Sequence, residues 1–331
     1  MAGEDAESAL TIEQQVRLER IFMPEAMRQR AKAGFTDENS VPMRFVHYTS
    51  AEAAIKIIQS RRMWMRNTMC MADYSEVLHG FAQMNSFFLN SDNNKTFTAA
   101  LDKCHSDISR DALFAFSHWW DRQRTETYIT SISEHDDRED EHGRLSMWRA
   151  FGGSAARVAL VFRLPYATKG SINLNLLFSP VAYLTQAETH EVIREVIKNL
   201  NDNMEFLKSI DRQAVVNMAF YMLLAGVVCL KHEGFREERE WRAIYVPMIR
   251  SSPLMKSSVE IVGGVPQTVY HIPLDASFDL AVEDLDFAKI LDRVIIGPTQ
   301  YPLAMQRAFQ TKLGEAGSLA PVVMSQIPLR T

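Results

Sequence analysis

The sequence has 331 residues, enough to bury a large core in one elaborated domain or in two smaller ones. With 47% hydrophobic and 23% charged residues it has an ordinary globular composition, and its net charge of -5 argues against a general affinity for nucleic-acid backbone. The three cysteines lack any metal-binding spacing, and no apolar run is long enough to cross a bilayer. We therefore expect free thiols, no metal site, no membrane contact and, since the first residues carry no apolar signal segment, a cytoplasmic protein.

Residues 1–40 are expected to form an N-terminal helical arm. Between residues 11 and 33, apolar side chains recur near a 3.6-residue period, as in an amphipathic helix. Pro24 lies inside this segment and should break or kink the helix, because proline has no amide hydrogen for the helical ladder.

The stretch over residues 41–80 organises the rest of the chain. Residues 43–48 are rich in side chains that favour a strand. Thr49 and Glu52 match a capping box, which predicts that a helix starts there, and a second strand is expected over 63–66. A strand, a capped helix and a second strand followed by polar residues is a common way to hold side chains around a ligand.

Strands and helices alternate along the remaining chain. The patterns predict a helix over 74–89, a strand over 127–133, a charged, exposed loop over 134–143, helices between 190 and 230, a strand over 238–246 and a hairpin turning at 263–264. These elements predict an α+β fold with a mixed, largely antiparallel sheet and an inserted helical layer. We expect one α+β domain over 41–315, with the helical insertion near 185–230, and a C-terminal tail over 316–331.

Four sets of polar residues fall at the ends of predicted strands, where side chains can converge. The sets are His47, Tyr48 and Thr49; Asn67, Asp73 and Glu76; Ser131, Ser133, Ser146 and Trp148; and Glu238, Glu240 and Arg242. Period-two spacing places the last three on one face of a strand. A carboxylate held ionised by a neighbouring arginine and pointed at a sugar hydroxyl can stabilise positive charge at an anomeric carbon, as in glycosidases.

Each set also has a purely structural interpretation. Residues 238–242 have the composition of a solvated strand edge with ion pairs, His47 that of a hydrogen-bonded structural histidine, and the polar residues after the second strand that of caps and turns. The acidic run 136–141 offers ligands for a divalent cation but lacks EF-hand spacing, and a solvated loop is the simpler interpretation. Residues 61–66 are the best candidate for a contact with single-stranded nucleic acid.

Taken together, these motifs resemble the bacterial family catalogued as domain of unknown function 2971. The motifs are His47-Tyr48-Thr49-Ser50; Trp64 with Asn67, Asp73 and Glu76; Ser131 and Ser133 leading to Ser146-Met147-Trp148-Arg149; Glu238, Glu240 and Arg242; and a late Gly297-Pro298. The resemblance spans roughly residues 43–313. It implies family membership without a function, because the family is largely uncharacterised.

The chain is more distantly similar to the ADP-ribosyltransferase fold, in which an early strand carries His or Arg and a late strand carries Glu-x-Glu. This resemblance implies that His47 holds the NAD ribose. Glu240 would orient a ribose hydroxyl and stabilise the oxocarbenium-like transition state, and Glu238 would activate the acceptor.

The remaining roles in that resemblance concern NAD binding. Ser131 or Ser133 would supply the motif of the middle strand. Tyr48 or Trp148 would stack on nicotinamide, with Thr49 beside them. Four further residues are expected to support the site without touching substrate, namely Asn67, Asp73, Glu76 and Arg242.

We therefore expect an NAD-dependent ADP-ribosyltransferase-like enzyme, with NAD as a substrate and a protein or nucleic acid as acceptor. A toxin or a phage-defence effector is the expected setting. Two alternatives stay open. One is a non-catalytic module of the same fold that senses a ligand or nucleic acid. The other is a hydrolase that cleaves a glycosidic or nucleotide bond with the same carboxylates.

Overall fold

A computed structural model describes residues 10–36, 40–70, 74–150, 156–166, 173–277 and 280–328. The chain divides into two compact units, each assembled from three separate stretches. The helical unit comprises Met1–Gln29, Asp73–Arg124 and Ala182–Glu233. The sheet unit comprises Arg30–Ala72, Thr125–Val181 and Gly234–Thr331. The chain therefore passes back and forth between the two units.

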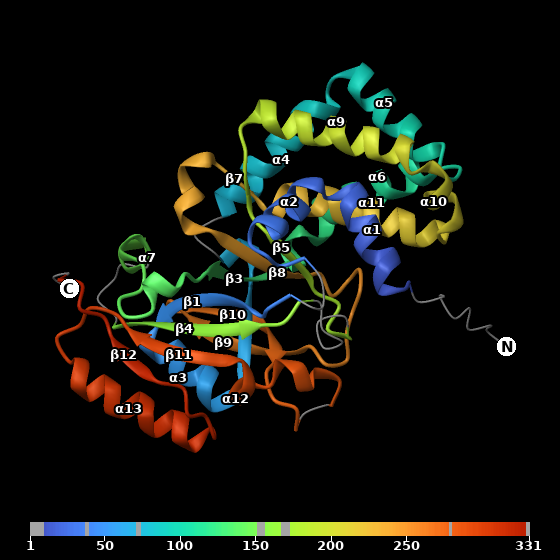
Figure 1. Cartoon of the computed structure of the whole chain (residues 1–331). Coiled ribbons are helices and arrows are strands. Elements are labelled where there is room, and N and C mark those ends of the chain that lie inside the picture. Colours follow the sequence, from blue (N-terminus) through green and yellow to red (C-terminus); the bar gives the residue numbers. More distant parts are fainter. Residues whose placement is uncertain are drawn as a thin grey trace. The chain divides into compact units, whose positions relative to one another are not determined.

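The sheet unit contains one ten-stranded sheet among the described residues (Figure 1). Its strands are β1 (Met43–Ser50), β2 (Arg62–Asn67), β3 (Tyr128–Glu134), β4 (Arg157–Leu164), β5 (Leu177–Pro180), β8 (Glu240–Tyr245), β9 (Lys256–Val262), β10 (Val265–Pro273), β11 (Leu291–Ile296) and β12 (Val322–Met324). The order is β12-β11-β4-β1-β3-β2-β10-β9, and β8 pairs with β3 and β5 beside this path. All these pairs are antiparallel except β11 with β12. The predicted α+β class with a mixed, largely antiparallel sheet is confirmed.

Four helices accompany the sheet among the described residues of this unit. They are α3 (Ala51–Ser60), α7 (Leu145–Ala150), α12 (Phe287–Ile290) and α13 (Pro302–Glu315). Ile57 and Ile58 of α3 join Phe309 and Leu313 of α13 in one buried apolar core with strand residues such as Leu160. Figure 1 shows α13, in red, running along the β11–β12 end of the sheet. Burial of these apolar side chains holds the helices on the sheet.

Local capping explains where α3 begins. The predicted capping box at Thr49 is wrong by one residue, because the Ser50 hydroxyl caps the helix by accepting a hydrogen bond from the amide of Ala53. Thr49 instead belongs to β1, which continues to Ser50. An extended N-cap residue followed directly by helix lets β1 pass into α3 without a loop.

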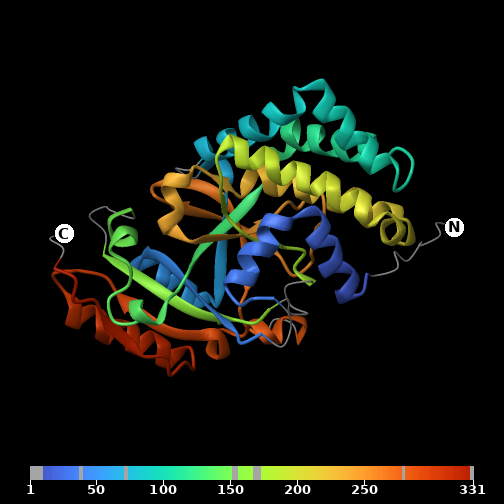
Figure 2. The ribbon, with the colours of Figure 1, turned by 45° about the horizontal axis from the view of Figure 1, so that its top comes forward.

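The helical unit is built around α11 (Arg212–Val228), which is apolar on most of its surface. Its other described helices are α1 (Ile12–Phe22), most of α2 (Pro24–Lys32), α4 (Tyr74–Phe88), α5 (Ser91–Asp102), α6 (Ile108–His118), α9 (Gln186–Asp202) and α10 (Met204–Ser209). A short parallel pair, β6 (Ala182–Tyr183) with β7 (Leu230–Lys231), completes the unit. Helix α11 packs against α4 and α6, and α9 lies beside α4 and α5 (Figures 1 and 2). A helix that is apolar nearly all round is expected at the centre of such a bundle.

Two sequence signals in the helices are explained by the structure. Helix α1 ends at Phe22 and α2 (Pro24–Lys32) begins at Pro24, so the predicted break at this proline is confirmed. Gly80 of α4 faces α11 closely, since a Cβ there would lie 2.2 Å from the carbonyl oxygen of Val227. No helix among the described residues is long and apolar enough to cross a membrane.

Candidate functional site

Strand β3 is the centre of the candidate site, because it has partners along both edges. On one edge it pairs with β8 over Tyr128–Ser133. On the other edge its start pairs with β2 and its end pairs with β1. Strands β1 and β2 therefore meet β3 at opposite ends, and the stretch of β3 around Ser131 lies between these two contacts.

The strand register places polar side chains of β3 and β8 on one face of the sheet. Ser133 lies opposite Glu240, and Ser131 lies opposite Arg242. On the far side of β8, Ser179 of β5 also lies opposite Arg242. Residues directly opposite each other in antiparallel strands point to the same face, so all five side chains share it. We call these residues the β3–β8 polar face.

Glu240 and Arg242 form a buried ion pair at the middle of this face. Glu240 is 6% exposed and Arg242 is 1% exposed. The Nε of Arg242 donates to Oε1 of Glu240 at 2.8 Å, and Nη2 donates to Oε2 at 3.2 Å. Such a two-bond contact fixes the carboxylate plane and favours its ionised form. The predicted solvated strand edge is therefore wrong for these two residues, because both side chains are buried.

One hydroxyl on the same face has no hydrogen-bond partner in the part of the chain that the structure describes. This group is the buried Oγ of Ser131, opposite Arg242. A buried hydroxyl without a partner costs free energy, of the order of 1–3 kcal/mol. A polar ligand atom would remove that cost.

Tyr48 reaches the same face from β1, where Val46, two residues earlier, lies opposite Ser133. Its hydroxyl accepts a hydrogen bond from the amide of Arg144 at 2.8 Å. Its ring makes an edge-on contact with Trp148, with ring centroids 4.8 Å apart. Burial raises the pKa of Tyr48 to about 12, so this hydroxyl stays un-ionised at neutral pH.

Trp148 is fully buried between two glycines and the sheet. A Cβ on Gly143 would lie 2.6 Å from the indole ring, and one on Gly297 would lie 3.0 Å from it. The indole Nε1 donates to the carbonyl oxygen of His142 at 2.8 Å. Trp148 thus closes the apolar cluster around Tyr48, and its indole ring is not exposed.

His47 does not share the β3–β8 polar face. Because adjacent strand residues alternate, His47 and Thr49 point to the opposite side from Tyr48. That side holds an aromatic cluster with Phe45 and Trp241. The Nδ1 of His47 donates to the carbonyl oxygen of Ser131 at 3.0 Å, and burial lowers the pKa of the imidazole, which favours its neutral form.

The other predicted residues are spread over both units. In the sheet unit, Asn67 closes a turn: its amide donates to the carbonyl of Thr125 and its Oδ1 accepts from the amide of Met69 at 2.9 Å. In the helical unit, Glu76 forms an ion pair with the buried Lys231 at 2.8 Å. Asp73 lies outside the described residues.

Glu238 and Ser146 complete the predicted set. Glu238 was predicted to share a strand face with Glu240 and Arg242, and this is wrong: it is half-buried and ends the 3₁₀ turn Glu233–Glu238, before β8 begins at Glu240. Ser146 lies in α7, where its buried hydroxyl has no hydrogen-bond partner among the described residues.

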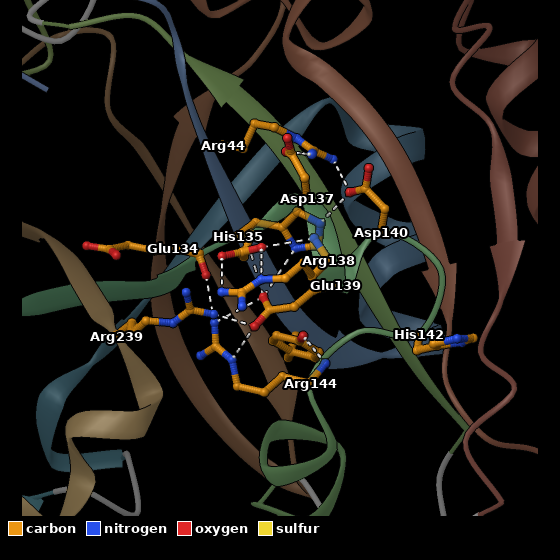
Figure 3. A network of polar contacts seen from close by, with 12 residues as sticks. Arg44, Glu134, His135, Asp137, Arg138, Glu139, Asp140, His142, Arg144 and Arg239 are labelled. Carbon is orange, nitrogen blue, oxygen red and sulfur yellow. Dashed lines mark hydrogen bonds and ion pairs between the residues drawn. The ribbon is translucent and has the colours of Figure 1, made fainter. Parts of the chain in front are cut away.

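The charged segment 134–143 was predicted to be an exposed loop, and this holds for only part of it: Asp137 is 89% exposed, whereas the side chain of His135 is fully buried. Figure 3 shows its side chains turned toward arginines from other parts of the sheet unit. Arg44 of β1 contacts Asp137 at 2.6 Å and also pairs with Asp140. His135, whose side chain is fully buried, donates to Asp140 at 2.9 Å. The segment is held by ion pairs with residues that are distant in sequence, which local composition does not reveal.

Arg144 links this segment to the stretch of chain just before β8, and Figure 3 shows its guanidinium beside Glu139. Its guanidinium donates to the carboxylate of Glu139 and to the carbonyl oxygen of Glu134. It also donates to the carbonyl oxygens of Glu237 and Glu238, at 3.0 and 2.9 Å. Arg144 therefore ties the chain just before Glu240 to the end of β3.

The acidic side chains in this network are held ionised by arginines. Hydrogen bonds and charge from Arg144 and Arg239 lower the pKa of Glu139 against the opposing effect of burial. Arg44 and Arg293 act in the same way on Asp140. Among the described residues, no group of three or more His, Cys, Asp or Glu side chains is arranged to hold a metal ion. The predicted alternative of a divalent cation at 136–141 thus has no supporting geometry in this network.

Sequence reasoning missed Arg44 and Arg144. A signal for Arg44 was present, since it alternates with Val46 and Tyr48 and so shares their face of β1. A signal for Arg144 was its place directly after an acidic run that needs compensating cations. Neither signal identifies which carboxylate each arginine contacts.

Comparison with known proteins identifies one family. Residues 147–243 match the family model described as "Protein of unknown function (DUF2971)". The match includes Trp148, Glu240 and Arg242, and is shorter than the expected span of 43–313. No curated protein and no solved structure matches the chain significantly.

Proposed function

We propose that this chain acts on the glycosidic bond of NAD, as an ADP-ribosyltransferase or an NAD glycohydrolase, with Glu240 as the central carboxylate. The observation that carries the proposal is the buried pair of Glu240 with Arg242, facing Ser133 and Ser131 of the neighbouring strand. Cleavage at an anomeric carbon develops positive charge on the sugar, and a fixed, ionised carboxylate stabilises that charge.

Each polar group on this face has a role in the proposal. Glu240 orients a ribose hydroxyl and faces the developing oxocarbenium ion. Arg242 holds the carboxylate in one orientation through its two hydrogen bonds. The Ser131 hydroxyl, which has no partner among the described residues, supplies a donor to the ligand. Tyr48 of β1, on the same face, supplies an un-ionised hydroxyl and an aromatic ring.

Two residues take a different place from the one the resemblance implies. His47 fixes β1 against β3 through its contact with the Ser131 carbonyl, since its side chain points to the other face. Trp148 supports the Tyr48 ring through their edge-on contact, because its own ring is buried. Glu238, just before β8, is the proposed group for activating an acceptor, either water or a nucleophile on a protein or nucleic acid.

A second function is supported by a different observation. Both oxygens of Glu240 already accept hydrogen bonds from Arg242, and the Nδ1 of His47 is bonded to backbone. Groups engaged in this way suit a non-catalytic module that binds a nucleotide or nucleic acid without turnover. A hydrolase that cleaves another glycosidic or nucleotide bond would use the same carboxylates.

The test is NAD consumption by the purified full chain and by Glu240→Gln. This substitution keeps the size of the side chain and removes its charge. We expect turnover in the wild type and a loss of about 100-fold or more in the variant, the scale of removing one transition-state electrostatic group. Glu315→Gln, at an exposed glutamate of α13, is the matched control and should keep full turnover.

Folding and binding are measured beside turnover. Circular dichroism and thermal unfolding show whether Glu240→Gln is folded, and calorimetry shows whether each protein binds NAD. A folded wild type that binds NAD without consuming it supports the binding module. Absence of both binding and turnover refutes the NAD proposal.

A toxin or defence role is part of the proposal only if it depends on the same carboxylate. Expression of the wild type should then arrest bacterial growth, while Glu240→Gln at equal protein level should not. Equal growth of the two strains removes this part of the proposal and leaves the biochemical part to the NAD assay.

A further inference from the structure

Strand β9 forms one edge of the ten-stranded sheet. It pairs with β10 on one side, and no described residue pairs with its other side. Its side chains are unusually apolar for an open edge, with Val259 72% exposed and Ile261 66% exposed. An open edge of this kind presents unpaired amides and carbonyls to any second strand.

The hairpin geometry defines which backbone groups of β9 are open. Gly263 and Gly264 both have positive φ, at 60° and 81°, and form a two-residue turn closed by Val262 and Val265. The pair that closes such a turn is hydrogen-bonded, and this pattern alternates along the ladder. The backbone groups of Ser257, Val259 and Ile261 therefore point away from β10.

The charges on β9 are complementary to a second copy of the same strand. Lys256 and Glu260 lie on the same face, with Ser258 midway between them. In the part of the chain that the structure describes, neither of the two charged residues takes part in an ion pair. In an antiparallel pair of β9 strands centred on Ser258, each Lys256 would lie opposite the Glu260 of the second copy. Opposite charges directly across an antiparallel pair are stabilising.

We propose that β9 pairs antiparallel with β9 of a second copy of this chain, around a two-fold axis at Ser258, so that the sheet continues from one copy into the next. The register agrees with the open backbone groups, because Ser257 and Val259 of the two copies then form hydrogen-bonded pairs. It also places the exposed Val259 side chains beside the second copy. The same patch on both copies forms the contact, as a two-fold interface requires.

Charges on an edge strand have another known use, which is to block unwanted pairing. Blocking requires only that the edge carry charge, of either sign. It does not explain why Lys256 and Glu260 have opposite charges and lie equally far from Ser258. The two interpretations predict different behaviour in solution. A blocked edge leaves the chain monomeric, whereas the proposed pairing gives a dimer whose strength depends on the relative signs at positions 256 and 260.

The first experiment is analytical ultracentrifugation of the full chain between about 1 and 100 µM, the range in which a small interface assembles. We expect dimer to form with concentration. Lys256→Glu should weaken the dimer by about tenfold, and Glu260→Lys by a similar factor, because each places like charges opposite each other. The double variant Lys256→Glu/Glu260→Lys should restore wild-type association. A monomeric wild type, or a double variant no better than the single ones, overturns the proposal.

The second experiment tests the register with cysteines. Residues on the two-fold axis in a non-hydrogen-bonded pair have Cα atoms about 4.5 Å apart, within the range of a disulfide. Ser258→Cys should therefore form a covalent dimer on mild oxidation. Val259→Cys should not, because diagonal positions lie about 7–8 Å apart or more. Equal cross-linking of the two variants refutes the register.

Native thiols set the background for this experiment. Cys104 and Cys229 are buried and Cys70 is half-buried, so the wild type oxidised in parallel is the control. The dimer proposal is independent of the proposed function, since β9 carries none of the residues of the β3–β8 polar face. Failure of the NAD assay leaves it standing, and a monomeric chain leaves the NAD proposal standing.

Discussion

Replacement of Arg144 by methionine should destabilise the sheet unit strongly. Arg144 is 8% exposed, and its guanidinium donates to one carboxylate and three backbone carbonyl oxygens. Methionine fills a similar volume and offers no donor. The substitution therefore leaves the carboxylate of Glu139 with one arginine fewer and the carbonyls of Glu134, Glu237 and Glu238 without this partner.

The magnitude follows from what is left behind. Removing one member of a buried ion pair typically costs about 3–5 kcal/mol, since the remaining charge stays buried. Glu139 retains its contact with Arg239, which reduces that cost. Each carbonyl that loses its donor adds up to roughly 1–3 kcal/mol, reduced where water can enter. Because the carbonyl contributions add to that of the ion pair, we expect a loss of at least about 3–5 kcal/mol in the free energy of unfolding of this unit.

The assay is urea denaturation at pH 7, combined with hydrogen exchange of the peptides that cover β3, residues 134–144 and β8. The unfolding midpoint should fall by about 1 M or more, and exchange should rise first at residues 134–144. Arg144→Lys keeps the charge next to Glu139 and loses the forked geometry, so it should fall between the wild type and Arg144→Met.

Arg138→Met is the matched control in the same segment. Its side chain is 89% exposed, and among the described residues its ion pair is with Asp136. We expect no resolvable change in the midpoint or in exchange. An equal effect of the Arg138 and Arg144 substitutions, or no effect of Arg144→Met, would refute the claim that this network holds the segment before Glu240.

Two further predictions concern pH and packing. Burial lowers the pKa of His135 below its ordinary 6.5, so the unfolded chain binds a proton at a higher pH than the folded chain does. The free energy of unfolding should therefore fall as the pH drops below about 6.5. His135→Asn should reduce this dependence on pH, measured as urea midpoints from pH 7.5 to 5. An unchanged slope would contradict a buried neutral imidazole. Gly80→Ala should lower the free energy of unfolding by roughly 1–3 kcal/mol or more, because the added Cβ meets the backbone of Val227. Gly314→Ala in α13 is the control: its Cβ meets nothing within 4 Å, so it should be neutral or stabilising by up to about 1 kcal/mol. Equal melting temperatures of the two glycine variants would show that α4 and α11 can separate without cost.

The sequence was informative wherever the signal is local. Strand-favouring side chains located β1, alternation of apolar and small hydroxyl residues located β3, and Gly263-Gly264 located the β9–β10 hairpin. Pro24 located the break between α1 and α2. These features depend on backbone preferences and on side-chain periodicity, which neighbouring residues determine.

The candidate site was less predictable because it depends on register. His47 and Tyr48 are adjacent, and the pairing of Val46 with Ser133 decides which of them shares a face with Glu240. A shift of one residue would exchange their places, and no local signal determines that shift. The spacing of Glu240 and Arg242 did predict that both share a face, and the structure shows them bonded.

Long-range ion pairs were beyond sequence reasoning for a similar reason. The run 134–143 has the composition of a solvated loop, and its attachment to the sheet depends on Arg44, nearly a hundred residues earlier, and on Arg239, about a hundred residues later. Composition states how many charges are present. Only the fold states which of them meet.

The interleaving of the two units affects how the protein is synthesised. Strand β8 completes the ladder on β3, yet residues 135–239, including the last stretch of the helical unit, leave the ribosome between them. During that time one edge of β3 is unpaired and can form non-native pairs with other strands. A fragment cut at residues 147–243 would contain only residues 240–243 of β8 and none of β3, and so would lack the strand with which β8 pairs. Only a chain that extends from β3 through β8 brings Glu240 and Ser133 into one ladder, so truncation or slow translation between the two strands leaves β3 unpaired and favours aggregation.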